Sequence, residues 1–149
     1  MRHLIGSNGA MSIIVDSNWR LLWEMRMDDP LDDAETMKID AHGNIVELGK
    51  KPQSFDEIGG QYIGLIKVSK NAVWKVRSFY HSLDKGIKYD GKDYDNTYMT
   101  TFIQLTIGNL MPVKAVKINA KWLEIDSIDD MERYHSMNIF SDFTKCFYI

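Results

Sequence analysis

The sequence predicts an α/β fold in which helices pack on a mixed β-sheet. Short apolar runs alternate along the chain with segments whose apolar residues recur at helical spacing. Two further strand-like runs are joined by a short loop that ends in glycine, which predicts a β-hairpin and therefore antiparallel pairing. The length of 149 residues matches one domain. Strands and helices in alternation are typical of layered domains whose ligands bind at the carboxyl ends of strands.

The first expected strand and the first expected helix follow one another near the start of the chain. Residues 12–15 (SIIV) are apolar and rich in β-branched side chains, as expected of a buried strand with parallel pairing. Asp16 closes this strand. Residues 18–27 are expected to be helical, because one face carries Trp19, Leu22, Trp23 and Met27. At this spacing the tryptophans are expected in the core rather than in a cage for a cation.

The hairpin is expected over residues 35–40 and 44–50, with Gly43 in its loop at a position that allows a positive φ. Residues 61–69 (QYIGLIKVS) form the next expected strand. Gly64 lies inside that strand. Because such glycines often mark the close approach of a ligand or of another backbone, we expect a close contact there.

Two helices and a loop are expected next. Ser69 is expected to cap a helix with an apolar face made by Ala72, Val73, Val76, Phe79 and Tyr80. Residues 83–96 are polar and rich in charge, which predicts a surface loop. Residues 98–110 predict a second helix, with one face formed by Met99, Phe102, Ile103, Thr106 and Ile107.

The last expected elements are two separate strands and a helix. Residues 113–118 (VKAVKI) fit neither period well, but their valines and their short length favour a strand. Residues 122–125 (WLEI) predict a short strand. Ser127 and Asp130 resemble a capping box with Asp in place of Glu, which predicts a helix to about residue 137. We expect a single domain over residues 1–149, with residues 136–149 as an unassigned tail.

Composition argues against several classes of function. Lys and Arg number 18 against 21 Asp and Glu, so the net charge of −3 is unlike that of a nucleic-acid binder that works by bulk charge. The one cysteine, Cys146, allows neither an internal disulfide nor a multi-cysteine zinc site. No apolar run approaches the ~20 residues of a membrane helix, and no signal peptide is visible. We therefore expect a cytoplasmic protein without a membrane or nucleic-acid partner.

The acidic segment WLEIDSIDD (residues 122–130) is the strongest local motif. Asp126 stands at the end of the expected strand, where a carboxylate suits a hard cation such as Mg²⁺, held together with substrate phosphates. The alternative is structural: Asp126 is an N-cap, and the acidic residues after it complement a helix dipole. Trp122, the first residue of this segment, is the one tryptophan that we consider for binding a ligand.

The segment GKKP (residues 49–52) places two lysines at the end of the hairpin, held by a proline. Lys50 and Lys51 could reach a phosphate. The alternative is an exposed, charged strand end that discourages edge pairing.

Five segments, taken in order, resemble the sugar-nucleotide type of nucleotidyltransferase over about residues 12–135. They are SIIVDSNWRLLWEMRMDDPLDDAETMKID, GNIVELGKKP, DEIGGQYIGLIKVS, YMTTFIQ and WLEIDSIDDMERY. The branch they are most similar to is that of the cytidylyltransferases acting on phosphocholine or 2-aminoethylphosphonate. The resemblance implies a Rossmann-like α/β/α fold and magnesium-dependent transfer of CMP from CTP to a phosphocholine- or phosphonate-type acceptor, with release of pyrophosphate.

The resemblance also implies roles for individual residues. Asp126 matches the family's magnesium ligand, and Lys51 matches a lysine that contacts the acceptor phosphate; these two are the expected catalytic residues. Glu35, Tyr62 and Glu124 align with positions near the family's acceptor pocket. Together with Trp122, which the acidic motif itself suggests, they are the residues expected to bind substrate.

One departure from the family is large. The family's glycine-rich triphosphate loop, of the type L-A-A-G-x-G-x-R, and a second metal aspartate do not occur among these residues. We therefore expect a partial Rossmann-like fold that lacks the N-terminal nucleotide-binding segment and is inactive alone. The alternatives are an enzyme completed by a separate N-terminal fragment or by a homodimer, and a non-catalytic ligand-binding or interaction module that retains the acceptor pocket.

Overall fold

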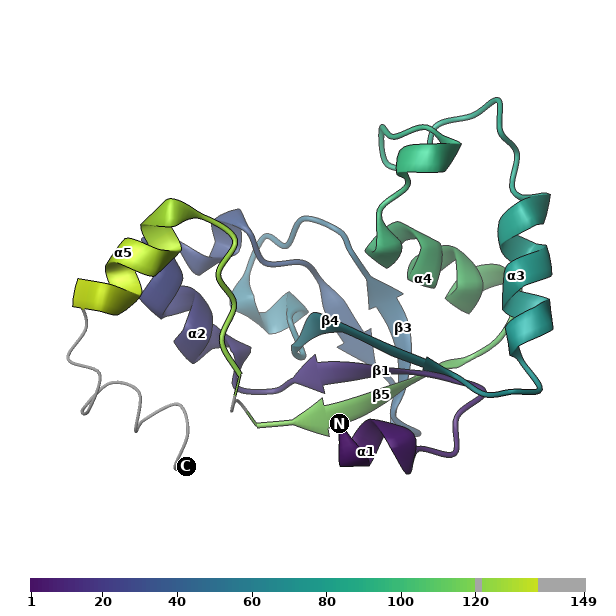
Figure 1. Ribbon diagram of the computed structural model, residues 1–149, viewed down its shortest axis with the longest axis horizontal. Coiled ribbons are helices and arrows are strands. Elements are labelled where there is room, and N and C mark those ends of the chain that lie inside the picture. Colours follow the sequence, from purple (N-terminus) through teal and green to yellow (C-terminus); the bar gives the residue numbers. More distant parts are fainter. Residues whose placement is uncertain (120–121, 137–149) are drawn as a thin grey trace.

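The computed structural model describes residues 1–119 and 122–136 and confirms the α/β class. Five strands form one mixed sheet in the order β2-β3-β5-β1-β4 (Figure 1). The strands are β1 (Met11–Asp16), β2 (Met37–Ile39), β3 (Asn44–Leu48), β4 (Gln61–Val68) and β5 (Val113–Ile118). The α-helices are α1 (Arg2–Ile5), α2 (Trp19–Arg26), α3 (Val73–Ser82), α4 (Met99–Asn109) and α5 (Ile128–Ser136), with short 3₁₀ turns at Pro30–Asp32, Phe55–Glu57 and Tyr94–Asn96.

Strand β1 lies inside the sheet and is buried at every residue. It pairs in parallel with β5 and antiparallel with β4, so the expected parallel strand is confirmed. Because β1 and β5 run in the same direction, their carboxyl ends lie together, at Asp16 and Ile118. This shared end is where a layered α/β sheet binds its ligands.

Two glycines were predicted to have special roles: Gly43 in the hairpin loop and Gly64 in the edge strand β4. Gly43 has a φ of 75°, as the hairpin loop requires. Gly64 also has a positive φ, 81°, but a Cβ added there would meet no described atom within 4 Å. The expectation that another backbone approaches closely at Gly64 is therefore wrong. The register between β1 and β4 shifts at this point, so the glycine permits a β-bulge instead.

Two hydrophobic clusters hold the layers together. The first lies between the sheet and α4, where Ile103 is fully buried against Ile13 and Val113. The second joins α2 to α5 through Trp19, Trp23 and Tyr134. Figure 1 shows the consequence: α2 and α5 lie side by side at one end of the sheet, while α3 and α4 lie at the other. The expected core role of the tryptophans in α2 is confirmed.

Two local predictions need correction. Residues 122–125 are not a strand; residues 122–127 have no regular structure, because Trp122 and Leu123 pack against the second cluster instead of joining the sheet. Ser69 does not cap α3 through its side chain: the helix begins at Val73, and the Ser69 carbonyl accepts hydrogen bonds from the N–H groups of Ala72 and Val73. Helix α3 buries little of its apolar face, and the exposed fraction of Val73 is 46%.

The capping box at the start of α5 is confirmed. The Asp130 N–H donates to Ser127 Oγ at 3.0 Å, and the Ser127 N–H donates to Asp130 Oδ2 at 3.0 Å. Helix α5 is described as far as Ser136. The expected helix end at about residue 137 and most of the expected tail lie outside the described residues.

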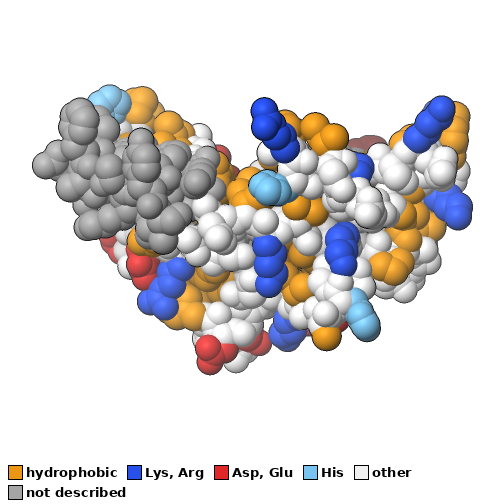
Figure 2. Space-filling view, turned by 90° about the horizontal axis from the view of Figure 1, so that it is seen from below, with side chains coloured by type: hydrophobic (Ala, Val, Ile, Leu, Met, Phe, Trp, Pro, Cys, Tyr) orange, Lys and Arg blue, Asp and Glu red, His pale blue; other side chains and the backbone are white. Residues whose placement is uncertain are grey.

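The surface gives two negative observations within the described residues. On the face shown in Figure 2, Lys and Arg side chains stand singly, separated by hydrophobic and uncharged groups, and do not gather in one basic patch. None of the described helices has the length and hydropathy needed to cross a membrane.

Gly60 allows the start of β4 to lie against the end of β1, and this close approach can be tested. A Cβ at Gly60 would lie 2.4 Å from Val15 Cγ1 and 3.0 Å from the Asp16 carbonyl oxygen. We expect Gly60→Ala to lower the free energy of unfolding by about 1–3 kcal/mol, measured by urea denaturation. The control is Gly108→Ala in α4, where a Cβ meets no described atom within 4 Å and should stabilise the helix by about 0.5–1 kcal/mol. Equal effects of the two changes would contradict the close packing at Gly60.

Candidate functional site

The residues predicted to act together are linked through the carboxyl end of β1. Trp122 Nε1 donates a hydrogen bond of 2.7 Å to Asp16 Oδ2. Asp16 lies opposite Gln61 in the antiparallel pairing with β4. The Gln61 side chain in turn bonds the backbone of Glu35 in both directions, donating from Nε2 at 2.7 Å and accepting at Oε1. Asp16 and Gln61, both buried, thus connect the segment of Trp122 to Glu35.

The acidic motif lies on the other side of Trp122, gathered around Arg26 at the end of α2. The Arg26 side chain is 4% exposed. Its guanidinium donates to three carboxylates: Nη1 to Glu124 at 2.6 Å, Nη2 to Asp126 at 2.8 Å and Nε to Asp130 at 3.0 Å. Arg26 therefore brings together the two expected site residues Glu124 and Asp126. The sequence pattern did not indicate a role for Arg26.

Charge and burial act differently on the members of this cluster. Burial opposes the charge of Arg26, but its bonds to Asp130, Glu124 and Asp126 outweigh burial and hold the pKa of the guanidinium above its ordinary value. The hydrogen bond from Arg26 is the main cause that keeps the pKa of Asp130 well below its ordinary range. Burial raises the pKa of Glu124 despite the contact with Arg26. Asp126, with a side chain 66% exposed, is the most open of the three carboxylates.

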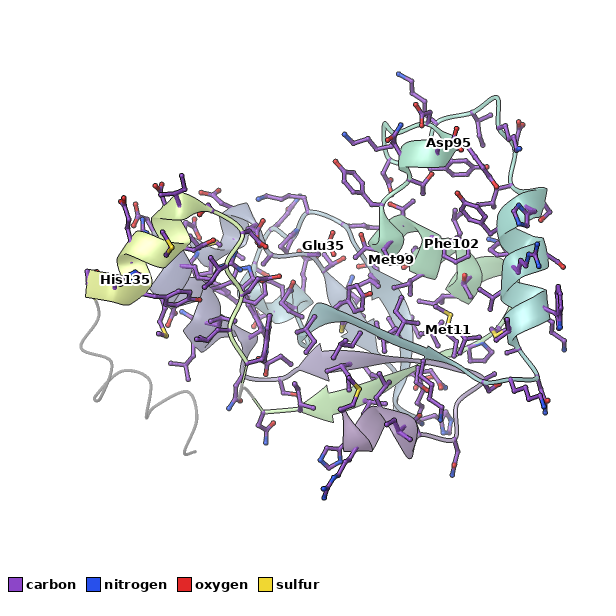
Figure 3. All side chains as sticks on the ribbon, viewed as in Figure 1. Met11, Glu35, Asp95, Met99, Phe102 and His135 are labelled. Carbon is purple, nitrogen blue, oxygen red and sulfur yellow. The ribbon has the colours of Figure 1, made fainter. Side chains whose placement is uncertain are left out.

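Glu35 lies just before β2, next to the start of α4. Figure 3 shows Glu35 and Met99 in the same region, and Thr100 Oγ1 donates a 3.1 Å hydrogen bond to Glu35 Oε1. Burial is the main cause that raises the pKa of Glu35, with smaller contributions from the negative charges of Asp33 and Asp90. Asp33 also raises the pKa of Glu124, so the same exposed carboxylate acts on both halves of the predicted site.

Tyr62 and the two lysines of the hairpin complete the predicted set. Tyr62 follows Gln61 in β4; it is half-buried against the first cluster, and burial raises the pKa of its phenol. Lys51 Nζ donates to the carbonyl oxygens of Leu31 and Asp32 at 2.5 and 2.6 Å. Its ammonium has three N–H donors, so one donor remains for a ligand.

Lys50 and Lys51 are separated in the fold. Lys50 forms an ion pair of 2.8 Å with Glu47, three residues earlier in β3, which agrees with the alternative of an exposed, charged strand end. Only Lys51 points toward the loop of Asp32 and Asp33.

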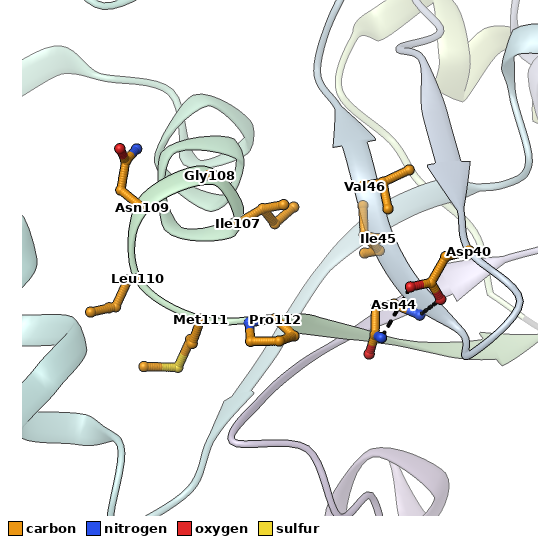
Figure 4. Close-up of a pocket in the computed structure, with 10 residues that line it drawn as sticks. All are labelled: Asp40, Asn44, Ile45, Val46, Ile107, Gly108, Asn109, Leu110, Met111 and Pro112. Atoms are coloured by element: carbon orange, nitrogen blue, oxygen red, sulfur yellow. Dashed lines mark hydrogen bonds between the residues drawn. The ribbon is translucent and has the colours of Figure 1, made fainter.

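A pocket of about 440 Å³ lies elsewhere, between the start of β3 and the end of α4 (Figure 4). Its lining includes Ile45, Ile107 and Met111, and none of the predicted site residues belongs to it. Its one carboxylate, Asp40, is bonded to the N–H groups of His42 and Asn44 and to the Asn44 side chain, which is the arrangement of a turn. This pocket does not coincide with the predicted chemistry.

The oxygen donors near Asp126 fit magnesium only in part. Within the described residues, no group of three or more His, Cys, Asp or Glu side chains could hold a metal ion. Glu124 and Asp126 offer hard carboxylate oxygens, and Arg26 occupies one oxygen of each. Two carboxylates completed by substrate phosphates are the usual way in which proteins hold Mg²⁺. The described residues therefore supply two carboxylates toward such an ion, and the remaining ligands would have to come from substrate.

Four residues at this site were not predicted to take part: Asp16, Arg26, Gln61 and Thr100. Asp16 was seen only as the end of a strand, although a carboxylate at that end is a known signal of a ligand site. Arg26 lay in the stretch WEMRMDD, where a charged residue near the end of an amphipathic helix looks like a solvated one.

No known family model matches the chain. The chain is, however, similar to a curated protein of Campylobacter jejuni, the CTP:phosphoglutamine cytidylyltransferase, with 45% identity over 132 residues. The match includes 89% of this chain and 52% of that enzyme. The chain spans about half the length of the relative that it matches. The likeness supports a relationship to the cytidylyltransferases, as the sequence motifs predicted, but it does not confirm phosphocholine or a phosphonate as the acceptor.

The raised pKa of Glu35 predicts a dependence of stability on pH. The folded protein holds the Glu35 proton more tightly than the unfolded chain, so the free energy of unfolding falls as the pH rises from the ordinary glutamate pKa through the raised one. Glu35→Gln should remove this loss, and in a series from about pH 4 to about pH 8 its advantage over the parent protein should grow once the pH exceeds the ordinary glutamate pKa. Urea denaturation across that range measures it.

Thr100→Val is the companion change, because the Thr100 hydroxyl lowers the pKa of Glu35. Its loss should make the fall in stability with pH larger. A difference between Glu35→Gln and the parent protein that stays constant with pH would show that Glu35 does not titrate in this way.

Proposed function

We propose that this chain forms the acceptor side of a cytidylyltransferase, which transfers CMP from CTP to a small phosphorylated acceptor and releases pyrophosphate. The similarity to the Campylobacter jejuni cytidylyltransferase over most of the chain carries the proposal. The fold supports it, because Asp16 and its pairing partner Gln61 connect the segment of Trp122 to Glu35 at the carboxyl end of β1.

In the proposed reaction each residue has a role set by its surroundings. Lys51, exposed and anchored on two carbonyl groups, would place its remaining donor on the acceptor phosphate. Asp126 and Glu124 would hold magnesium, which would offset the negative charge that develops on the transferred phosphoryl group. Trp122, bonded to Asp16, would keep these carboxylates beside the strand end.

Glu35 and Tyr62 would recognise the other end of the acceptor. The partly buried Glu35 carboxylate suits a positively charged nitrogen or an N–H donor, and the half-buried Tyr62 ring suits a cation. Phosphocholine and 2-aminoethylphosphonate, which the sequence motifs suggest, and phosphoglutamine, the substrate named for the relative, all carry nitrogen. We therefore propose an acceptor that combines a phosphate or phosphonate with a nitrogen-bearing group.

Binding of the nucleotide would need residues in addition to these 149. The 149 residues contain no loop of the L-A-A-G-x-G-x-R type, and they span about half of the relative. We propose that this chain alone binds an acceptor but does not turn over CTP, and that a nucleotide-binding segment completes the site.

The proposal predicts binding without turnover for the chain alone and turnover for a completed enzyme. The isolated chain is mixed with CTP, Mg²⁺ and each of the three acceptors, and pyrophosphate release is measured, while calorimetry measures acceptor binding. A fusion of this chain with the part of the Campylobacter enzyme outside the match should form a CDP-linked product. In the fusion, Asp126→Asn should lower kcat by about 100-fold or more, since charge stabilisation of the transition state is lost.

Asp129→Asn is the matched control, because Asp129 lies three residues after Asp126, in the first turn of α5, and takes no part in the Arg26 cluster among the described contacts. It should leave kcat within a few-fold of the parent fusion. Acceptor binding by the chain together with an inactive fusion would favour the non-catalytic binding module, and pyrophosphate release by the chain alone would contradict the need for a completing segment.

A further inference from the structure

Arg26 is the one described residue whose side chain contacts three members of the acidic motif. It lies at the end of α2, while Glu124, Asp126 and Asp130 lie about 100 residues later in the chain. The side chain is almost completely buried, with its guanidinium carbon 5.6 Å from the centre of the Trp23 ring. The three carboxylates differ in exposure: those of Asp130, Glu124 and Asp126 are 6%, 32% and 66% exposed.

The bonds to Arg26 use one oxygen of Glu124 and one oxygen of Asp126. Arg26 binds Oε2 of Glu124 and Oδ2 of Asp126. Within the described residues, no hydrogen bond is made to the other oxygen of either carboxylate. Because Arg26 is buried and both carboxylates reach the surface, the guanidinium holds them from the protein side. Their second oxygens stay available to a ligand on the solvent side.

No regular structure holds residues 122–127 in place. Their position depends on side chains: Trp122 on Asp16, Arg26 on the two carboxylates, and Tyr134, whose hydroxyl donates to the Glu124 carbonyl oxygen at 3.1 Å. Asp130 is doubly fixed, because it accepts from Arg26 and also closes the capping box of α5. Residues 122–127 have no regular structure, so Arg26 connects the carboxylates of Glu124 and Asp126 to the capped start of α5.

We infer that Arg26 is a positioning residue, which holds Glu124 and Asp126 from behind so that their outer oxygens can bind a divalent cation together. This inference rests on the proposed function, because it takes these two carboxylates as cation ligands. Groups that hydrogen-bond metal-binding carboxylates orient them, and their loss typically weakens metal binding by about 10- to 100-fold.

An arginine suits this role in a way that lysine does not. Its planar fork presents donors in several fixed directions, so Nη1, Nη2 and Nε reach three different carboxylates at once. A lysine would keep the charge, but its single ammonium could not reproduce these three directions. Arg26→Lys therefore separates orientation from charge.

The experiment measures binding of the metal alone by NMR in the full chain. Titration with Mg²⁺ gives the dissociation constant, and Mn²⁺ places the ion by paramagnetic broadening of amide signals. In the parent protein we expect broadening centred on residues 124–126. In Arg26→Lys and Arg26→Met we expect binding weakened by about 10-fold or more. The amide spectrum of each variant shows whether the fold is retained, and Arg26→Lys is the informative variant if Arg26→Met unfolds.

Arg133→Met is the matched control, because Arg133 also links α5 to the α2 end of the molecule, through an exposed ion pair with Asp28. It should leave the dissociation constant unchanged. Equal metal binding by the parent protein and a folded Arg26→Lys variant would overturn the positioning role and leave the proposed function intact. Absence of broadening at residues 124–126 in the parent protein would show that Glu124 and Asp126 do not bind the ion together, and would overturn the positioning role.

Discussion

The buried guanidinium of Arg26 is the interaction on which the candidate site depends. It joins the end of α2 to a segment that is remote in sequence and has no regular structure, and it satisfies three carboxylates that would otherwise repel one another. Removing one partner of such a buried ion pair typically costs about 3–5 kcal/mol, because a charge is left without compensation. The position of the acidic motif is thus coupled to the stability of the α2–α5 contact.

The other fixed point is the end of β1. Asp16 is fully buried where the parallel neighbour β5 and the antiparallel neighbour β4 both meet β1. Its carboxylate binds the Trp122 indole on one side, and its pairing partner Gln61 binds Glu35 on the other. The two halves of the site therefore share a rigid strand end as a support, although Glu35 and residues 122–127 lie outside the strands of the sheet. A ligand that contacts both halves would be recognised by side chains whose relative positions the sheet determines.

Local patterns predicted most elements of the fold, and they failed where tertiary contacts decide. The strand of Ile13, the helix of Trp23 and the capping box of Ser127 were predictable, since periodicity and capping chemistry are local. The segment after Trp122 alternates like a strand, but packing against the α2 cluster prevents it from reaching the sheet. For the same reason Glu124 and Asp126 were identified as site residues from their motif, whereas Arg26 was not. Nothing near Arg26 in the sequence indicates a partner about 100 residues away.

The electrostatics of the whole region then limit what it can bind. Arg26 is committed to three carboxylates, and Lys51 places two of its donors on backbone carbonyls. Asp33 raises the pKa of both Glu35 and Glu124, so negative charge extends from one half of the site to the other. A phosphate alone would meet repulsion at such a surface. A ligand that also carries a metal ion at one end or a positively charged nitrogen at the other would be attracted. The charge distribution thus disfavours a simple anion and favours a ligand that brings positive charge to one end of the site or the other.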